Sequence, residues 1–133
     1  MIFKTNLKLS CVLVAALIAA NAAAADVSQD APRWIPIASS SNGTLDLFVD
    51  RYRIRWQGPI VNAWVRSVDQ YGYSIQQYEG NCTAMSIRSL QSTTYSNDGI
   101  LMRSDALVSP WRPVVPESIA ETGLVALCAN RPQ

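Results

Sequence analysis

The 133-residue sequence contains no histidine, and its only lysines are Lys4 and Lys8. Histidine is the commonest general base and the commonest transition-metal ligand in proteins. Without it, neither an imidazole relay nor a zinc–histidine site can form, and beyond residue 8 there is no amine for a Schiff base. These absences remove most familiar catalytic designs. We therefore predict that the protein is not an enzyme, and that it has neither a metal site nor a cofactor.

Charge is also scarce, because only 16% of the residues are charged and the formal net charge is +1. Proteins that bind nucleic acid through a positive field need clustered basic residues. The balanced composition excludes that mode of binding, so we expect no nucleic-acid partner. A chain of this length, 49% hydrophobic, has room for one domain with one modest core.

The one sustained apolar run covers residues 11–20, follows Lys4 and Lys8, and leads into the alanines Ala22–Ala25. A basic head, a short apolar stretch and a small-residue exit are typical of a secretory signal peptide. Spanning a bilayer takes about 20 apolar residues, so a retained membrane anchor is the less favoured alternative. We predict a signal peptide over residues 1–25, a loose polar leader over residues 26–33 and no membrane span in the mature chain.

Cysteine usage agrees with export. Cys11 lies in the predicted signal peptide, which leaves Cys82 and Cys128 as a single pair in an oxidising compartment. A bridge between them would contribute about 4 kcal/mol in the chain-entropy model, a large share of the stability of a small domain. The alternative is a pair of free thiols, although no histidine is present to activate either one. We predict the disulfide.

Apolar and β-branched runs separated by turn residues predict a series of antiparallel strands. Pro36 has no backbone N–H, so the first strand belongs at a sheet edge. Asn42–Gly43 suits a hairpin turn, and the lost alternation near Leu90 indicates a bulge. We expect strands over residues 34–37, 45–50, 60–68, 82–95 and 100–103, with Val61, Ala63, Val65 and Ser67 on one side of the third.

The end of the chain carries the clearest helix signal. Ser118 stands three residues before Glu121 in the pattern of a capping box, with Pro116 just outside. The apolar residues that follow allow one buried stripe, for which we expect Ile119, Leu124, Val125, Leu127 and Cys128. Strands followed by one helix predict an α+β domain with an antiparallel sheet.

Three arginines form the sharpest local feature. Arg51, Arg53 and Arg55 share one face if the segment is a strand, because side chains alternate along a strand. Guanidinium groups bind anions through paired hydrogen bonds, so this face is a candidate for acidic partners or sulfated sugars. The alternative is a solvated face paired with Asp46 and Asp50.

Tyrosines mark a second candidate site. Tyr71, Tyr73 and Tyr78 lie in the polar, glycine-containing stretch 69–81, which we expect to be a connection between strands. Tyrosine offers a large, rigid contact area at low entropic cost, as in recognition loops. Equally, these side chains could lie back on the sheet. A carboxylate hydrolase built on Asp46 and Asp50 is the least supported reading, because it requires a cleft with two facing acids.

One ordered set of residues, covering nearly the whole predicted mature chain, resembles the surface-adhesin protein E family. The resemblance implies a bent antiparallel sheet, with a C-terminal helix packed on it and joined to it by a disulfide, in a bacterial exported protein. It also implies a turn after Asp50, in contrast to the continuous strand that the arginine alternation favours. Asn81 departs from the acidic residue that members often have there. The set is Trp34, Asp50, Gly58, Trp64, Asn81–Cys82, Arg88, Tyr95, Asp98–Gly99, Trp111, Pro116–Glu117–Ser118 and Cys128.

The resemblance extends to function, since a member of the family is an outer-surface adhesin that binds host matrix and plasma proteins and can dimerise. We therefore expect residues 34–130 to form an exported, non-enzymatic binding module for protein partners, in the periplasm or on the bacterial surface. The alternative is a periplasmic structural or regulatory protein, such as an inhibitor or an envelope-complex subunit, without host contact. Fold transfers within a family more safely than function does.

Overall fold

The computed structural model describes residues 32–133. The predicted signal peptide and residues 26–31 of the predicted leader lie outside the described residues. The described chain forms strands followed by one helix, as the sequence predicted. The elements are β1 (Trp34–Ser39), β2 (Leu45–Asp50), β3 (Arg55–Gln57), β4 (Ile60–Asp69), β5 (Gly72–Asn81), β6 (Ser86–Ser96), β7 (Leu101–Asp105), β8 (Arg112–Pro113) and α1 (Ile119–Ala129).

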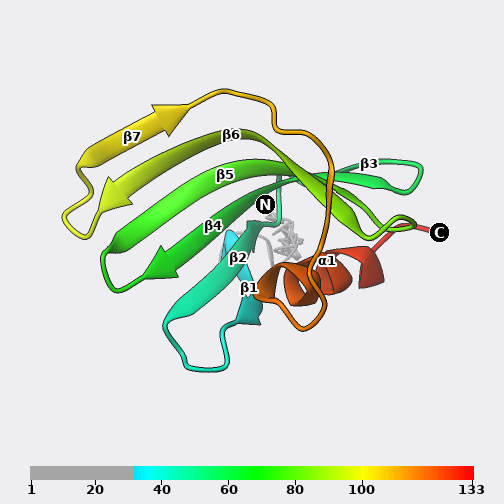
Figure 1. Ribbon diagram of the computed structural model, residues 1–133, viewed down its shortest axis with the longest axis horizontal. Coiled ribbons are helices and arrows are strands. Elements are labelled where there is room, and N and C mark those ends of the chain that lie inside the picture. Colours follow the sequence, from blue (N-terminus) through cyan, green and yellow to red (C-terminus); the bar gives the residue numbers. More distant parts are fainter. Residues whose placement is uncertain (1–31) are drawn as a thin grey trace, which may run out of the picture. The chain divides into compact units, whose positions relative to one another are not determined.

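All strand pairs of the sheet are antiparallel, and the strand order is β1-β2-β4-β5-β6-β7. The short strands β3 and β8 pair with β4 and β6. Figure 1 shows a strongly curved sheet with α1 lying against one of its sides. The predicted α+β class, with a bent antiparallel sheet and one C-terminal helix, is confirmed.

The core lies between α1 and one face of the sheet. Val61, Ala63 and Val65 of β4 are buried, and the first two form one cluster with Leu124 and Leu127 of the helix. Their spacing of two residues puts them on the same side of the strand, as the sequence predicted. We call this side the inner face and the opposite side, which carries the even-numbered residues of β4, the outer face.

The helix begins where the capping pattern placed it. The hydroxyl of Ser118 accepts a hydrogen bond from the backbone N–H of Glu121 at 3.2 Å, and the Glu121 carboxylate accepts one from the N–H of Glu117. Leu124 and Leu127 are buried against the sheet, whereas Val125 is 52% exposed. The expectation of a buried Val125 is therefore wrong: one residue advances a helix by 100°, which turns this side chain away from the face that Leu124 presents.

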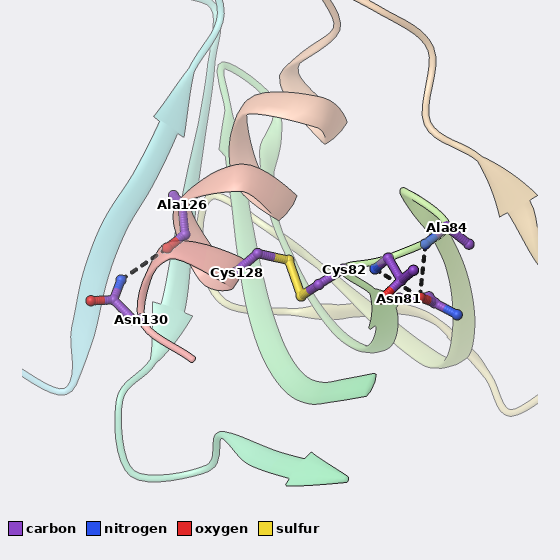
Figure 2. Close-up of a disulfide and its surroundings, with 7 residues drawn as sticks. Asn81, Cys82, Ala84, Ala126, Cys128 and Asn130 are labelled. Carbon is purple, nitrogen blue, oxygen red and sulfur yellow. Dashed lines mark hydrogen bonds between the residues drawn. A yellow bond between two sulfur atoms is a disulfide. The ribbon is translucent and has the colours of Figure 1, made fainter. Parts of the chain in front are cut away.

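A disulfide joins Cys82, just after β5, to Cys128 in the last turn of α1, with 5.7 Å between the Cα atoms. Figure 2 shows the bridge running from the helix to the turn that follows β5. That turn is held by Asn81, whose side-chain oxygen accepts hydrogen bonds from the N–H groups of Thr83 and Ala84. The predicted pairing is confirmed, and it ties the last turn of the helix to the end of β5, a central strand of the sheet.

The largest difference in a strand boundary concerns β6. The predicted strand 82–95 begins only at Ser86, because residues 82–85 form a turn in which Met85 has a positive φ of 47°. The bulge near Leu90 is confirmed: the register passes from Gln77 opposite Gln91 to Tyr78 opposite Ser89, which leaves Leu90 without a partner. The bulge bends β6 and adds to the curvature of the sheet.

Candidate functional site

The three arginines do not share a face. Strand β2 ends at Asp50, residues 51–54 form a turn, and Arg55 opens β3. The interpretation of Arg51–Arg55 as a continuous strand is therefore wrong, and the turn that the family resemblance implied is confirmed. A turn breaks the alternation that would have aligned the guanidinium groups.

Each of these arginines has a different neighbour. The Arg51 guanidinium lies over the ring of Tyr52, and Arg53 Nε lies 3.8 Å from Asp50 Oδ2. Arg55 donates hydrogen bonds to backbone carbonyls of the same turn. The turn is thus rich in positive charge without forming one flat anion-binding surface.

The turn is organised around Asp50, which is completely buried. Its carboxylate accepts two hydrogen bonds from Arg33, at 2.9 and 2.6 Å, and one from the N–H of Tyr52. The hydrogen bonds and the negative charge of Asp50 raise the pKa of Arg33 above its usual value. A buried carboxylate needs such compensation. Asp46, on the same strand, accepts a hydrogen bond from the hydroxyl of Ser39. Both carboxylates therefore make structural contacts.

The tyrosines lie at three separate places, because the stretch expected to be a connection contains the central strand β5. Asp69 ends β4, and its carboxylate accepts hydrogen bonds from the backbone N–H groups of Tyr71 and Gly72. These bonds close a tight turn. At Gly72 a Cβ atom would lie only 2.1 Å from the carbonyl oxygen of Tyr95, so a larger residue does not fit. Tyr71 is 76% exposed in this turn, whereas Tyr73 and Tyr78 lie on β5.

Tyr73 belongs to a patch on the outer face. Its ring stacks on that of Tyr95, its direct partner on β6, with 4.9 Å between the centroids. The Arg66 guanidinium lies over the Tyr73 ring, 4.4 Å from its centroid, and Leu101 of β7 is the cross-strand partner of Tyr95. We call Arg66, Tyr73, Tyr95 and Leu101 the outer-face patch. Stacked aromatic pairs and cation–π contacts give such a patch a defined shape.

Arg66 has unused hydrogen-bonding capacity. Its Nε atom is buried and has no hydrogen-bond partner among residues 32–133. Because Nε is closed to solvent, only the terminal nitrogens of the guanidinium are open to a partner molecule. The planar guanidinium lies over Tyr73, and its donors suit a carboxylate or a carbonyl of a partner molecule.

Exposed apolar residues continue the patch toward one end of the sheet. The β4–β5 and β6–β7 turns are joined there by a hydrogen bond from the side chain of Asn97 to the carbonyl of Gln70. Tyr71, Ile100, Leu101 and Met102 are all exposed in or beside these two turns. Contiguous exposed apolar residues mark interaction sites on soluble proteins.

Tyr78 lies on the inner face, as the partner of Ala63, and therefore away from Tyr73. Its hydroxyl donates a hydrogen bond to the side-chain oxygen of Gln76. Burial raises the pKa of Tyr78, because a charged phenolate is disfavoured away from water. Tyr78 lines a cavity under α1 rather than a recognition loop.

Arg66, Tyr95 and Leu101 were not predicted as binding residues from the sequence. The signal that could have revealed them is the tight turn at residues 70–71, because a hairpin there brings Arg66 and Tyr73 onto one face of adjacent strands. Elsewhere, residues 32–133 contain no group of three acidic or cysteine side chains arranged to hold a metal ion. Among the same residues, no helix has the length and apolar character needed to cross a membrane.

Comparison with known proteins links the chain to one family. The model of the family described as surface-adhesin protein E matches residues 34–129, most of the chain. Searches of the curated proteins and of the solved structures found no match. The match covers every strand and the helix, as well as both cysteines of the disulfide.

Proposed function

Because the chain belongs to the surface-adhesin protein E family, we propose that it is an exported, non-enzymatic module that binds a protein partner through the outer-face patch. Tyr71, at the neighbouring turn, extends this surface. The partners that fit the family are extracellular-matrix or plasma proteins of a host. The disulfide supports an oxidising location outside the cytoplasm.

The observation that carries this proposal is the stack of Arg66, Tyr73 and Tyr95 on a face that α1 does not cover. Tyrosine and arginine dominate the energetics of protein interfaces, because they bury large areas and still make hydrogen bonds. The stack holds these side chains in place before binding, which lowers the entropic cost of association. The sheet beneath them provides a rigid support.

Binding to a panel of immobilised matrix and plasma proteins tests the proposal. For a partner found in this way, Tyr73→Ala and Arg66→Gln should each weaken binding about tenfold or more, as expected for the centre of an interface. Tyr71→Ala should have a smaller effect. Tyr52→Ala is the matched control, because this exposed tyrosine follows β2 at the end of the sheet away from the patch.

Unchanged binding by Tyr73→Ala and Arg66→Gln would overturn the assignment of the patch. The same assay includes Arg51→Ala, Arg53→Ala and Arg55→Ala, because the charged turn is the second candidate surface. A loss confined to these three variants would move the binding site to that turn.

Location separates an adhesin from a periplasmic structural or regulatory protein. An adhesin on intact cells should be cleaved by added protease. Protection from protease in intact cells, combined with release by osmotic shock, would contradict the surface role and favour the periplasmic alternative. The measurement needs only an antibody to the protein and a cytoplasmic marker as the lysis control.

A homodimer is a second proposal, supported by the exposed edge at β7. Among the described strands, the sheet ends at β7, and Leu101 and Met102 are exposed there. An open strand edge with apolar side chains can pair with another strand. Light scattering should then give twice the chain mass, and Met102→Lys should shift the protein to a monomer. A wild-type monomer at high concentration would contradict this proposal.

A further inference from the structure

We propose that the space between α1 and the inner face binds a single-chain carboxylic acid, with the alkyl chain under the helix and the carboxylate at Arg112. The first observation is a cavity of about 210 Å³. It lies between the helix and strands β1, β2, β4, β5 and β6, and no charged side chain of residues 32–133 lines it. Its lining residues include Leu47, Val61, Ala63, Tyr78, Ala120 and Leu127.

The cavity is a partly open cleft under the helix and not a sealed void. Protein interiors are close-packed, and unfilled space larger than a water molecule is uncommon in them. Small-molecule sites are clefts of this kind, lined mainly by hydrophobic side chains. Small residues contribute to its lining, namely Ala63, Gly80, Ala120 and Gly123. The two glycines are themselves closely packed, because an added Cβ would lie 2.5 Å from Leu124 at Gly80 and would touch Leu47 and Ile37 at Gly123.

A surface groove adjoins the cavity. The groove has a volume of about 450 Å³ and shares Tyr78, Ile87 and Ala120 with the cavity. Its remaining lining comes from β6, β8 and the segment leading to α1, and includes serine hydroxyls and two arginines, Arg88 and Arg112. An apolar interior that opens beside basic and hydroxyl groups matches an amphiphilic ligand with an anionic head.

Arg112 is the arginine available to that head. It is the cross-strand partner of Ile87, which packs against the core on the inner face, so Arg112 projects from the same face. It is exposed, and it forms no ion pair with any of the described residues. Arg88, in contrast, is bound to Glu79 at 2.6 Å.

The apolar cavity and the groove with its arginine together indicate the chemical class of the ligand. A carboxylate binds a guanidinium through two parallel hydrogen bonds, which a neutral alcohol cannot match. The hydroxyl of Tyr78, which borders both the cavity and the groove, already donates its hydrogen bond to Gln76. Arg112 therefore remains the donor for the carboxylate. The cavity then receives the alkyl chain, whose transfer from water supplies the driving force.

Titration calorimetry of the purified, disulfide-bonded protein with decanoate, below its micellar concentration, tests the proposal, with decan-1-ol as the uncharged probe. We expect saturable binding of both probes. Arg112→Gln should weaken decanoate binding about five- to tenfold, the worth of one charge-assisted pair, and leave decan-1-ol binding unchanged. Ala120→Leu should fill the mouth of the cavity and abolish binding of both. Ala129→Leu, an exposed position of the same helix, is the matched control.

The site is also observable without substitutions. In the wild-type protein, decanoate should shift the methyl resonances of Leu47, Leu124 and Leu127 and leave those of exposed Val125 and Leu107 in place. This measurement on the wild-type protein keeps the test decisive even if Ala120→Leu does not fold. Absence of saturable binding, or methyl shifts only at exposed residues, would overturn the proposal that the cavity binds the alkyl chain. Equal decanoate affinity of the wild type and Arg112→Gln would overturn the assignment of the carboxylate.

Discussion

Asp50 connects the start of the domain to the turn after β2. Its buried carboxylate binds the side chain of Arg33 and the backbone N–H of Tyr52, and it lies near Arg53. The aspartate therefore fixes the edge strand β1, which follows Arg33, to the end of β2. Removing it leaves an empty polar space and an arginine without its partner.

We expect Asp50→Ala to lower the free energy of unfolding by about 2 kcal/mol, because the fold loses the hydrogen bonds that the buried carboxylate accepts from Arg33 and from the N–H of Tyr52, whereas the half-exposed Arg33 regains contact with water. Urea denaturation measures the change. Asp46→Ala is the control, since it loses only one solvent-exposed hydrogen bond, from Ser39, and should cost less than about 1 kcal/mol. Equal losses for the two variants would show that Asp50 is not the organising contact.

Tyr78 gives the protein a pH dependence in the alkaline range. Burial raises the pKa of this phenol above the ordinary value of 10.0, which applies to the unfolded chain. Above pH 10 the unfolded state therefore loses the proton first, and the free energy of unfolding falls as pH rises toward the folded-state pKa. We expect Tyr78→Phe to reduce this fall and the exposed control Tyr71→Phe to leave it unchanged. Identical alkaline profiles for wild type and Tyr78→Phe would contradict the assignment.

At the scale of single elements, the helix start is the clearest case in which a local sequence signal determines structure. Ser118 satisfies the N–H of Glu121, one of the backbone donors that a helix leaves unpaired at its first turn. This contact is made within four residues, so the sequence pattern suffices to predict it.

We expect Ser118→Ala to destabilise the protein by about 1 kcal/mol, the usual cost of losing an N-cap. Ser41→Ala, in the exposed β1–β2 turn, is the control and should be neutral. Thermal unfolding followed by circular dichroism measures both. A neutral Ser118→Ala would mean that the neighbouring contacts of Glu121 hold the helix start alone.

Elements whose identity depends on distant contacts were harder to predict. β5 is polar and contains Gly72 and Gly80, so its sequence is typical of a loop, yet it pairs along its whole length with β4 and β6. Gly80 is required there by tertiary packing, because a Cβ atom would lie 2.5 Å from a methyl carbon of Leu124. Residues 51–55 show the reverse case. Their alternation of arginine with other residues is typical of a strand, but the contacts of Asp50 impose a turn.

At the scale of the whole molecule, the disulfide was predictable because the expected mature chain has only one pair of cysteines. The binding surface was not, because it is assembled from β4, β5, β6 and β7. Of the tyrosines singled out in the sequence, only Tyr73 belongs to the outer-face patch, with Tyr71 beside it. Arg66 and Tyr95 join it through strand register, which single-sequence patterns do not specify.

We expect replacement of Cys82 and Cys128 by serine to lower the free energy of unfolding by about 4 kcal/mol, chiefly through the less constrained unfolded chain. Reduction of the wild-type protein should reproduce the effect. Denaturant unfolding of the oxidised, reduced and substituted forms measures it. Equal stability of the oxidised and substituted forms would show that packing alone holds α1 on the sheet.

Hydroxyl-radical footprinting of the protein, free and bound to a captured matrix or plasma protein, tests most directly whether the partner occupies the outer face. We expect protection of Tyr73, Tyr95 and Leu101, while Tyr52 and the exposed helix residue Val125 keep their reactivity. Protection of Tyr52 or Val125, with the outer-face patch fully reactive, would contradict it.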